Sequence, residues 1–425
     1  MLDPKIIREQ TDIVRAGLAK KHGDTQLVDR FLELDQKRRS LQTSVEKFQA
    51  ELNIASTEMA AAAPEEREVK RESLRELSDK VKTGAAALTE LEAELLLIHR
   101  QIPNLPASDV PEGETDKENV VVKTVGKKPE FTFEPKDHEA LTINLHLLDT
   151  ERGTKVAGSK FYYLKNELVI LEQAVLRFAL DTMRSKGFNL LTVPHMAKVD
   201  AFYGAGHFAT PEDAVEGDAY QLERDNLYLA GTAEVGLINY HADEVIPEDQ
   251  LPLRYAGISP CYRREAGTYG KETRGLYRVH QFNKVEMVSL VKPEDSEKEH
   301  EMLLSIAEEL LQKLGLSYQV VLNCGGDLGH PQAKKWDIET WLPGMNKYGE
   351  THSCSNDTDW QARSLGIRSK SAAGERYFVH TLNNTVIASP RILVAIIENY
   401  QEADGSIRIP DALVSYTGFD RIRVG

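Results

Sequence analysis

The chain has 425 residues, enough for two or three domains, and 52 lysines and arginines against 67 aspartates and glutamates give it a net charge of −15. This acidic balance argues against indiscriminate nucleic-acid binding, although a local basic surface can still contact RNA. Three well-separated cysteines disfavour disulfides and a zinc knuckle. The sequence has no apolar run of membrane-spanning length and no signal peptide, so we expect a cytoplasmic protein with no membrane partner.

The N-terminal part of the chain predicts helices. Residues 1–23 predict a short helix and a linker. Apolar residues then recur alternately three and four positions apart over residues 31–59, and again over residues 74–102. Two such heptad seams, interrupted at residues 60–66, predict an antiparallel helical hairpin, a coiled-coil arm about 50 Å long.

Two features of this arm concern its packing and its charge. Gly84 occupies a position where a seam residue is due, which predicts local looseness. The basic residues of the first helix are open to two interpretations: a local basic surface, or charges that only solvate the coiled coil. These residues are Lys37, Arg38, Arg39 and Lys47.

The segment after the arm predicts one long helix among shorter elements. Residues 107–135 hold prolines and glycines and predict a linker, and residues 137–148 predict a short helix. A loop is predicted over residues 153–158. An amphipathic helix over residues 165–186 then leads into a strand over residues 188–194, which ends at a proline.

A glycine-rich stretch, residues 203–217, predicts a mobile loop before the next strand. An apolar run from Leu227 ends in Thr232, Ala233 and Glu234. By itself a Thr-x-Glu pattern at the end of a strand indicates only a helix cap.

Residues 258–288 predict two antiparallel strands joined by a long charged loop that breaks at residues 267–270. Arginines converging from two strands would form a multi-donor clamp for phosphate oxygens. Glu265 follows Arg263 by two residues, which places both on one face of a strand. The alternative is a solvated hairpin with surface ion pairs. The arginines of this segment are Arg263, Arg264, Arg274 and Arg278.

The C-terminal third predicts a helix, two strands, and a strand that runs into a final helix. The first three elements are expected over residues 293–314, 318–322 and 336–341. Residues 380–401 predict a strand followed by a helix that starts near Pro390. Arg391 therefore lies at a helix N-terminus, where the helix dipole favours phosphate.

These patterns together resemble the class II aminoacyl-tRNA synthetases. The helix, strand and proline over residues 165–194 resemble motif 1 of that class, and the strand and helix carrying Arg391 resemble motif 3. The sequence segments REAG, TRGL, HQFNKVE and LVAIIENYQ are similar to segments of the bacterial-type seryl-tRNA synthetases. That resemblance extends from MLDPKIIRE to IPDALVSYTGF, essentially the whole chain. R-x-E, a loop and R-x-x-x-F resemble motif 2, and comprise Arg263, Glu265, Arg278 and Phe282.

The resemblance implies an α+β fold with two domains. Residues 107–425 would form the class II catalytic core, a six- or seven-stranded antiparallel sheet flanked by helices, and would dimerise through motif 1. Residues 1–106 would form the tRNA-binding arm, which in this family contacts the long variable arm of the serine tRNA.

The reaction implied has two steps. L-Serine and ATP give seryl-adenylate and diphosphate, and tRNA(Ser) then takes the seryl group and releases AMP; tRNA(Sec) is a further candidate acceptor. No general base is required, because the carboxylate of serine is already ionised at neutral pH. Arg263 and Arg391 would be catalytic, stabilising charge on the phosphates.

The resemblance also implies the binding residues. A carboxylate and a hydroxyl three residues apart near phosphates suit Mg²⁺, which would lie at Glu350 and Ser353. The serine pocket would comprise Thr232, Ala233, Glu234, Glu286, Asn383 and Thr385. The ATP site would comprise Arg263, Arg264, Glu265, Arg278, Val279, Phe282, Glu350, Thr351, His352, Ser353 and Arg391.

Two alternatives remain at this stage. A class II paralogue could load an amino acid onto a carrier protein, but such a protein would not be expected to keep a full tRNA-reaching arm. A non-catalytic regulator on the same core would be expected to have lost a phosphate-binding arginine, yet Arg263, Arg278 and Arg391 are all present.

Overall fold

The computed structural model describes residues 1–265 and 275–423. The chain divides into two compact units: one holds residues 2–19 and 23–103, and the other holds residue 1, residues 20–22 and the chain from residue 104 onward. The loop break predicted at residues 267–270, and Arg274, lie outside the described residues. Within the described ranges, no helix is both long enough and apolar enough to cross a membrane.

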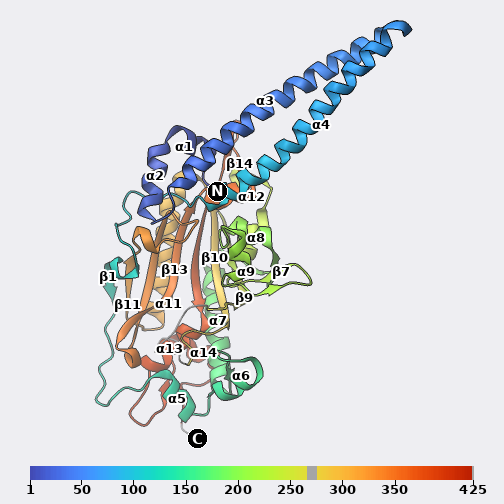
Figure 1. Cartoon of the computed structure of the whole chain (residues 1–425). Helices are drawn as coiled ribbons and strands as arrows, with labels where there is room; N and C mark the ends of the chain where they lie inside the picture. The colour runs from blue at the N-terminus through green and yellow to red at the C-terminus, as the bar shows by residue number, and fades with distance from the viewer. Residues whose placement is uncertain (266–274, 424–425) are drawn as a thin grey trace. The chain divides into compact units, whose positions relative to one another are not determined.

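The N-terminal unit is built on two long antiparallel helices (Figure 1). They are α3 (Gln26–Ala61) and α4 (Pro64–Gln101), which confirm the predicted hairpin. Only Ala62 and Ala63 separate them, so the break is narrower than predicted. The stretch before them holds two helices, α1 (Pro4–Glu9) and α2 (Thr11–Lys20), where one was expected.

Gly84 marks a close approach of the two long helices. A Cβ atom built at this position would lie 2.6 Å from Cγ2 of Val45 on α3, which is closer than carbon atoms can pack. The absent side chain therefore lets the helices come together here, and the predicted looseness at Gly84 is replaced by tight packing.

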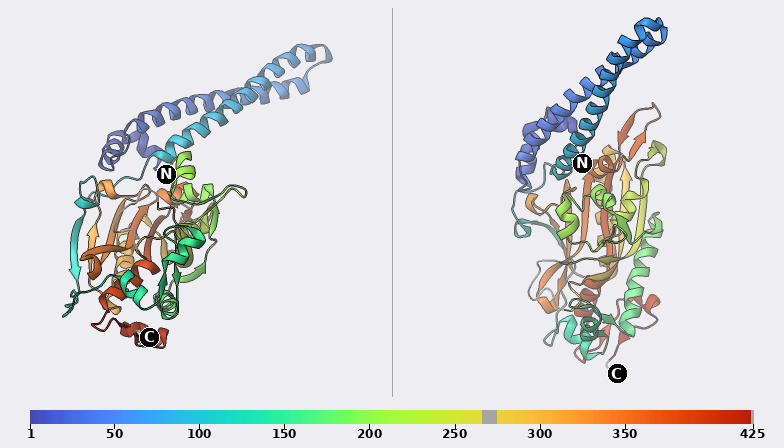
Figure 2. Two further views of the ribbon diagram at one scale, coloured as in Figure 1. Left: turned by 60° about the horizontal axis from the view of Figure 1, so that its bottom comes forward. Right: turned by 45° about the vertical axis from the view of Figure 1, so that its right-hand side comes forward.

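The second unit is organised around an eight-stranded sheet (Figure 2). Its strand order is β1-β11-β12-β13-β16-β10-β9-β4, and every pair is antiparallel except β4 and β9. It therefore has more strands than the six or seven expected, and one parallel pair. The strands, in sheet order, are β1 (Val120–Val125), β11 (Tyr318–Leu322), β12 (Lys334–Leu342), β13 (Lys347–Thr358), β16 (His380–Ala388), β10 (Gln281–Val291), β9 (Leu253–Tyr262) and β4 (Asn189–Thr192).

Three long helices cover this sheet and share one hydrophobic core with it. They are α7 (Glu167–Ser185), α11 (Ser296–Lys313) and α13 (Ser389–Asn399), all at predicted positions. Gly187, in the left-handed conformation at φ +82°, follows α7 and turns the chain into β4. Helix α14 (Asp411–Thr417) packs against α7 near the C-terminus.

Short strands form small sheets at the margins of this unit. They are β2 (Leu148–Asp149) with β3 (Tyr163–Leu164); β5 (Met196–Lys198), β7 (Leu227–Leu229) and β6 (Gln221–Leu222); β8 (Val245–Pro247), β14 (Arg368–Lys370) and β15 (Arg376–Phe378); and β17 (Ile407–Arg408) with β18 (Arg421–Ile422).

Three segments differ from the sequence prediction. The expected linker contains β1 at one edge of the main sheet. Of the expected loop at residues 153–158, all but the last residue belongs to helix α6 (Thr150–Ala157). The expected mobile stretch contains helices α8 (Val199–Ala205) and α9 (Pro211–Glu216), and a capping box between Thr210 and Asp213 fixes the start of α9. The remaining short helices are α5 (His138–Asn144), α10 (Glu234–Ile238) and α12 (Trp360–Leu365).

Candidate active site

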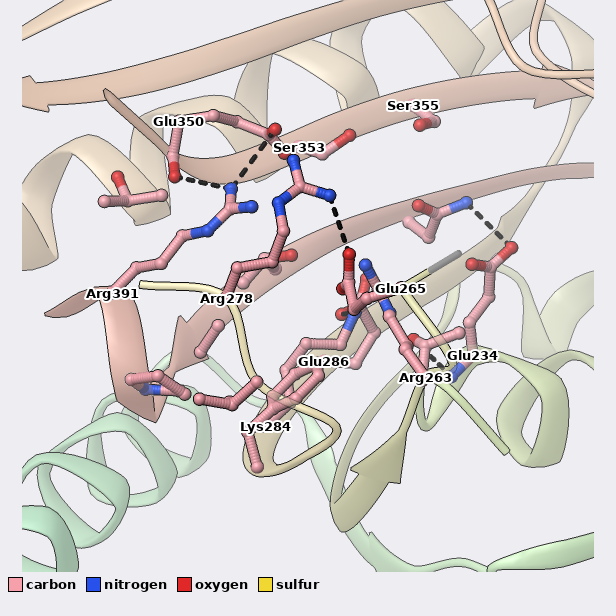
Figure 3. Close-up of a pocket in the computed structure, with 18 of the residues that line it drawn as sticks. Glu234, Arg263, Glu265, Arg278, Lys284, Glu286, Glu350, Ser353, Ser355 and Arg391 are labelled. Carbon is pink, nitrogen blue, oxygen red and sulfur yellow. Dashed lines mark hydrogen bonds and ion pairs between the residues drawn. The ribbon is translucent and has the colours of Figure 1, made fainter. Parts of the chain in front are cut away.

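A polar cavity opens over the central strands β10, β13 and β16 of the sheet (Figure 3). Segments far apart in the sequence line it: the start of α10, the described residues just after β9 and just before β10, and the start of α13. The predicted site residues that line it are Thr232, Glu234, Arg263, Glu265, Arg278, Val279, Phe282, Glu286, Glu350, Thr351, Ser353, Asn383, Thr385 and Arg391.

Strand β10 supplies one wall through the two-residue repeat of its side chains. Phe282, Lys284 and Glu286 all point into the cavity, as alternate residues of one strand face must. Strand β16 lies beside β10, with Glu286 opposite Thr385. The register shifts at the next residue, Val386, which has no partner on β10.

A β-bulge in β13 explains how Glu350 and Ser353 come to face the same cavity. Residues three apart on a regular strand point to opposite faces. Ser353 pairs with Asp337 on β12 and Glu350 pairs with Glu339, but Thr351 between them is an extra residue without a partner. The inserted residue restores both side chains to one face, where both line the cavity.

Arg391 projects from the first turn of α13 and contacts Glu350. Its guanidinium lies 3.2 Å from the Glu350 carboxylate, and Nη1 donates a hydrogen bond of 2.7 Å to the Glu350 backbone oxygen. Desolvation would raise the pKa of Glu350, but the positive charges of Arg391, Lys335 and Arg263 outweigh it and hold that pKa below its ordinary value. Glu350 is therefore ionised at neutral pH.

Arg263 and Glu265 both reach the cavity, but from beyond the end of a strand. Strand β9 ends at Tyr262, and Glu265 has a left-handed backbone with φ +48°. The expectation that these two side chains share a strand face is therefore wrong, because a turn places them. Glu265 forms an ion pair of 2.6 Å with Arg278. The Arg263 guanidinium lies 5.4 Å from the centre of the Phe282 ring.

Glu234 lies at the floor of the cavity inside a hydrogen-bond network. Gln361 donates a bond of 2.9 Å to its carboxylate, Asn383 donates one of 3.2 Å, and Nε2 of His207 lies 3.6 Å away. Burial would raise the pKa of Glu234, but the contacts with His207, Lys284 and Gln361 together hold it below its usual value. The site thus keeps a buried carboxylate charged, as recognition of an ammonium group requires.

Lys284 and Glu286 form a buried ion pair of 2.5 Å, and their side chains are 8% and 2% exposed. Burial is the main reason that the pKa of Glu286 is raised, and the nearby Glu234 charge adds to it, while Lys284 opposes both. The cavity therefore holds two carboxylates whose pKa values are displaced in opposite directions.

Three predicted side chains lie outside the cavity lining. Ala233 is buried beside α10. The Arg264 guanidinium lies 5.9 Å from the centre of the Tyr220 ring. His352 is buried on the other side of β13, where its Nε2 lies 3.1 Å from the Val386 carbonyl, and burial lowers its pKa to about 4. A neutral imidazole in that position supplies no charge to a phosphate.

Several lining residues were not predicted. Lys284 could have been found, because it alternates with Phe282 and Glu286 on one strand. The other lining residues become neighbours only through the fold, and no local pattern marks them. They are His207, Tyr277, Gln332, Ser355, Ala388 and Pro390.

The described residues contain no group of three or more histidines, cysteines and carboxylates arranged to hold a metal ion. Glu350 and Ser353 nevertheless offer two oxygen donors on one face of the cavity. A hard divalent cation prefers such donors and completes its shell with water or phosphate oxygens. These residues fit a cation that arrives with a bound nucleotide.

Family models match both parts of the chain. Residues 1–106 match the seryl-tRNA synthetase N-terminal domain, and residues 219–400 match the tRNA synthetase class II core domain of the G, H, P, S and T enzymes. A serine–tRNA ligase of Treponema denticola is 45% identical over 99% of this chain and 100% of its own length.

Solved structures agree with these matches over nearly the full length. The seryl-tRNA synthetase of Pyrococcus horikoshii, solved with ATP, is 39% identical, covers 99% of both chains and superposes with a TM-score of 0.91. The cytoplasmic serine–tRNA ligase of Naegleria fowleri, solved with AMP, is 29% identical over 100% of this chain and 99% of its own, with a TM-score of 0.86.

Proposed function

The chain belongs to the seryl-tRNA synthetase family, and from that membership we propose that it attaches L-serine to tRNA(Ser). In the first step the serine carboxylate attacks the α-phosphorus of ATP, forming the acyl–phosphate bond as the bond to diphosphate breaks. In the second, a hydroxyl of the terminal tRNA ribose attacks the seryl carbonyl and AMP leaves. tRNA(Sec) is a further candidate acceptor.

The observation that carries this proposal is the cavity itself. It brings three arginines from separate segments, Arg263, Arg278 and Arg391, to the same space as a pair of buried carboxylates. Arginines suit phosphate oxygens, and buried carboxylates suit the ammonium and hydroxyl groups of an amino acid. One cavity therefore offers complementary charge to both substrates of amino-acid activation.

For ATP we assign Arg263 to the α-phosphate and Arg278 and Arg391 to the β- and γ-phosphates. Glu265 forms an ion pair with Arg278, and Glu350 forms one with Arg391. These ion pairs keep the side chains extended into the cavity, so little reorganisation is needed when phosphate binds. The adenine would stack on Phe282, and Glu265 would accept a hydrogen bond from its amino group.

For serine we assign Glu234 to the α-ammonium and Glu286 to the hydroxyl, with Thr232, Asn383 and Thr385 completing the pocket. Asn383 bonds to Glu234, and Thr385 lies opposite Glu286 on the neighbouring strand, which fixes the pocket geometry. An amino acid without the hydroxyl would leave the Glu286 carboxylate buried without that partner, which disfavours alanine strongly.

Glu350 and Ser353 would hold Mg²⁺ with the nucleotide. The ion would neutralise phosphate charge. The bulge at Thr351 places both oxygen donors on the same face of β13.

We assign residues 1–106 to a tRNA-binding arm and residues 107–425 to the catalytic core. The core would form a homodimer through α7 and β4. Strand β4 is at one edge of the main sheet and exposes Leu190 (40%), and α7 exposes Ile170 (43%). An exposed apolar side chain on an edge strand and another on the adjoining helix favour a partner on this side. A cytoplasmic location is consistent with access to tRNA.

The carrier-protein and regulator alternatives are not favoured. Relatives named as serine–tRNA ligases match this chain from end to end, arm included. Diphosphate exchange into ATP, measured with each of the twenty amino acids in turn, tests the activation step. We expect exchange with serine alone; exchange that prefers another amino acid would overturn the serine assignment.

A further inference from the structure

Outside the cavity, a buried histidine joins two segments that carry nucleotide-site residues. His138 is the first residue of α5 and is 5% exposed. Its ring contacts Glu398 on α13, which is fully buried, and the backbone of Leu276. None of these three residues lines the cavity, and the roles assigned above do not use them.

The hydrogen bonds fix which ring nitrogen carries the proton. The backbone N–H of Leu276 lies 3.1 Å from Nε2 of His138 and can only donate, so Nε2 is the acceptor. Nδ1 must then carry the hydrogen, which it donates to Oε1 of Glu398 at 2.9 Å. The imidazole is therefore neutral: it accepts one hydrogen bond at Nε2 and donates one at Nδ1.

Glu398 extends this connection to the rest of the nucleotide site. Its Oε1 also accepts a bond of 3.0 Å from the His138 backbone, and its Oε2 accepts one of 2.9 Å from Gly344, in the turn between β12 and β13. Glu398 and Arg391 lie seven residues apart on α13, two helical turns along one side of the helix. The carboxylate therefore ties α13 to the turn that precedes Glu350.

Leu276 is the other end of the connection. It directly precedes Tyr277 and Arg278, both of which line the cavity. The Tyr277 ring lies 4.9 Å from the Arg391 guanidinium, so this segment also contacts the start of α13. Gly275 has φ +59°, and a Cβ there would lie 2.3 Å from Nε2 of His138. Only glycine lets the chain pass the imidazole closely enough for the Leu276 bond.

We propose that His138 is a positioning residue for the nucleoside triphosphate: through Leu276 and Glu398 it fixes the segment of Tyr277 and Arg278 relative to α13 and Arg391. It touches neither substrate. This inference rests on the proposed function, because its readout is ATP use in amino-acid activation. It adds a connection behind the cavity that sets the spacing of two phosphate-binding arginines.

The two ends of the imidazole can be tested separately with a matched pair of variants. In His138→Gln the amide oxygen takes the place of Nε2 and still accepts from Leu276. The Nδ1 bond to Glu398 is lost, but the backbone N–H of residue 138 still donates to Glu398, so the two segments stay connected. In His138→Asn the amide nitrogen takes the place of Nδ1 and still donates to Glu398, while the Leu276 N–H is left buried without an acceptor. Each variant removes one side-chain hydrogen bond, so a purely structural histidine would affect both alike.

Diphosphate exchange with serine, with KM measured separately for ATP and for serine, and thermal unfolding of each variant provide the readout. We expect H138N to raise the KM for ATP about 10-fold, with the KM for serine unchanged, and H138Q to keep an ATP KM close to wild type. Equal ATP KM values for the two variants, or a parallel rise in the KM for serine, would overturn the proposal.

Gly275→Ala reaches the same contact from the other side, should H138N fail to fold. Its Cβ would push the chain away from His138, so the ATP KM should rise while the histidine is intact. A folded G275A protein with unchanged ATP KM contradicts the proposal. Wild-type protein without serine-dependent exchange would instead refute the proposed function, so the two failures are distinguishable.

Discussion

At the residue scale, we expect activation to depend most on Arg263. It lies where the α-phosphate is assigned, beside the Phe282 ring, and its Nε donates to the Gly231 carbonyl at 3.2 Å. Removing one donor to developing transition-state charge costs about 3 kcal/mol, or about 100-fold in rate. We therefore expect Arg263→Ala to lower the rate of diphosphate exchange by at least about 100-fold.

Arg264→Ala is the matched control for that variant. It removes the neighbouring guanidinium, which lies over Tyr220 and outside the cavity lining. Exchange by R264A should stay near the wild-type rate, with both variants folded by circular dichroism. The assignment of Arg263 fails if R263A retains normal exchange, or if the two variants lose activity equally.

We expect Glu286 to give serine binding a pH dependence. Burial raises its pKa above that of an exposed glutamate, so its carboxylate is protonated, and loses charge, at a higher pH than usual as pH falls. We expect the KM for serine to rise as the pH is lowered from 7 towards 5, while the KM for ATP changes little. The pKa of Glu234 is lowered, so that carboxylate stays charged over the same range.

Glu286→Gln should remove that pH dependence and raise the KM for serine about 10- to 100-fold, the worth of a hydrogen bond to a charged group. The measurement is initial-rate exchange at saturating ATP across the pH range. A wild-type serine KM that is flat down to pH 5, or a variant that follows the wild-type curve, would contradict this role.

The sequence predicts some residues of the site and misses others, and the reasons are physical. Phe282 and Glu286 were predicted from the family resemblance, and strand alternation, which puts both on one face of β10, would have added Lys284 between them. Alternation alone, however, would have separated Glu350 from Ser353, because the bulge at Thr351 depends on pairing with β12 rather than on local sequence. The buried orientation of His352 likewise follows from its contact with Val386 on β16, a neighbouring strand that is far away in the sequence.

At the element scale, the arm is separable from the chemistry. Its two long helices belong to a compact unit distinct from the one that holds the whole cavity. We expect replacement of residues 31–102 by a short linker to leave serine-dependent diphosphate exchange near normal while charging of tRNA collapses. The loss should appear mainly in the KM for tRNA and should grow with salt, because phosphate contacts release counterions. If the shortened protein charges tRNA as efficiently as the full chain, the arm instead binds another protein or stabilises the dimer.

The basic residues of α3 should contribute only part of that loss. Lys37 contacts Glu33 at 2.6 Å and Arg39 contacts Asp35 at 3.0 Å, both on their own helix. The Lys37–Glu33 pair is exposed on both sides, so it is weak and readily exchanged for a phosphate, whereas Asp35 is buried and holds Arg39 more firmly. Joint neutralisation of Lys37, Arg38, Arg39 and Lys47 should raise the KM for tRNA by less than removal of the arm does. An unchanged KM would favour the interpretation that these charges only solvate the coiled coil.

Elements with strong periodicity could be predicted, and those fixed by tertiary contacts could not. The heptad seams predicted α3 and the C-terminal end of α4 to within about five residues, while α4 begins ten residues before its seam, at Pro64. Helix α6 was missed because Gly153 looks like a loop residue. In the fold it is required, because a Cβ there would lie 2.3 Å from the Phe161 carbonyl oxygen. Strand β1 was missed because its valines are exposed and show no alternation.

At the scale of the whole molecule, the two edges of the main sheet should behave differently. Edge strand β4 and the adjoining α7 are the proposed dimer surface, and β1 forms the opposite edge. The joint substitutions Ile170→Glu and Leu190→Glu should give a monomer by light scattering, because buried, unpaired charges oppose association. Val121→Glu, at an exposed residue of β1, should remain dimeric. A double variant of unchanged mass would place the dimer surface elsewhere.

The central claim is that this chain joins serine to a tRNA, and charging of total tRNA with labelled serine tests it most directly. The purified protein, ATP and Mg²⁺ should transfer serine to an acid-precipitable, base-labile product, and the charged species should be tRNA(Ser). Alanine and threonine should give no product under the same conditions. Serine-dependent diphosphate exchange without any charging of tRNA would contradict the claim and would favour a carrier other than tRNA.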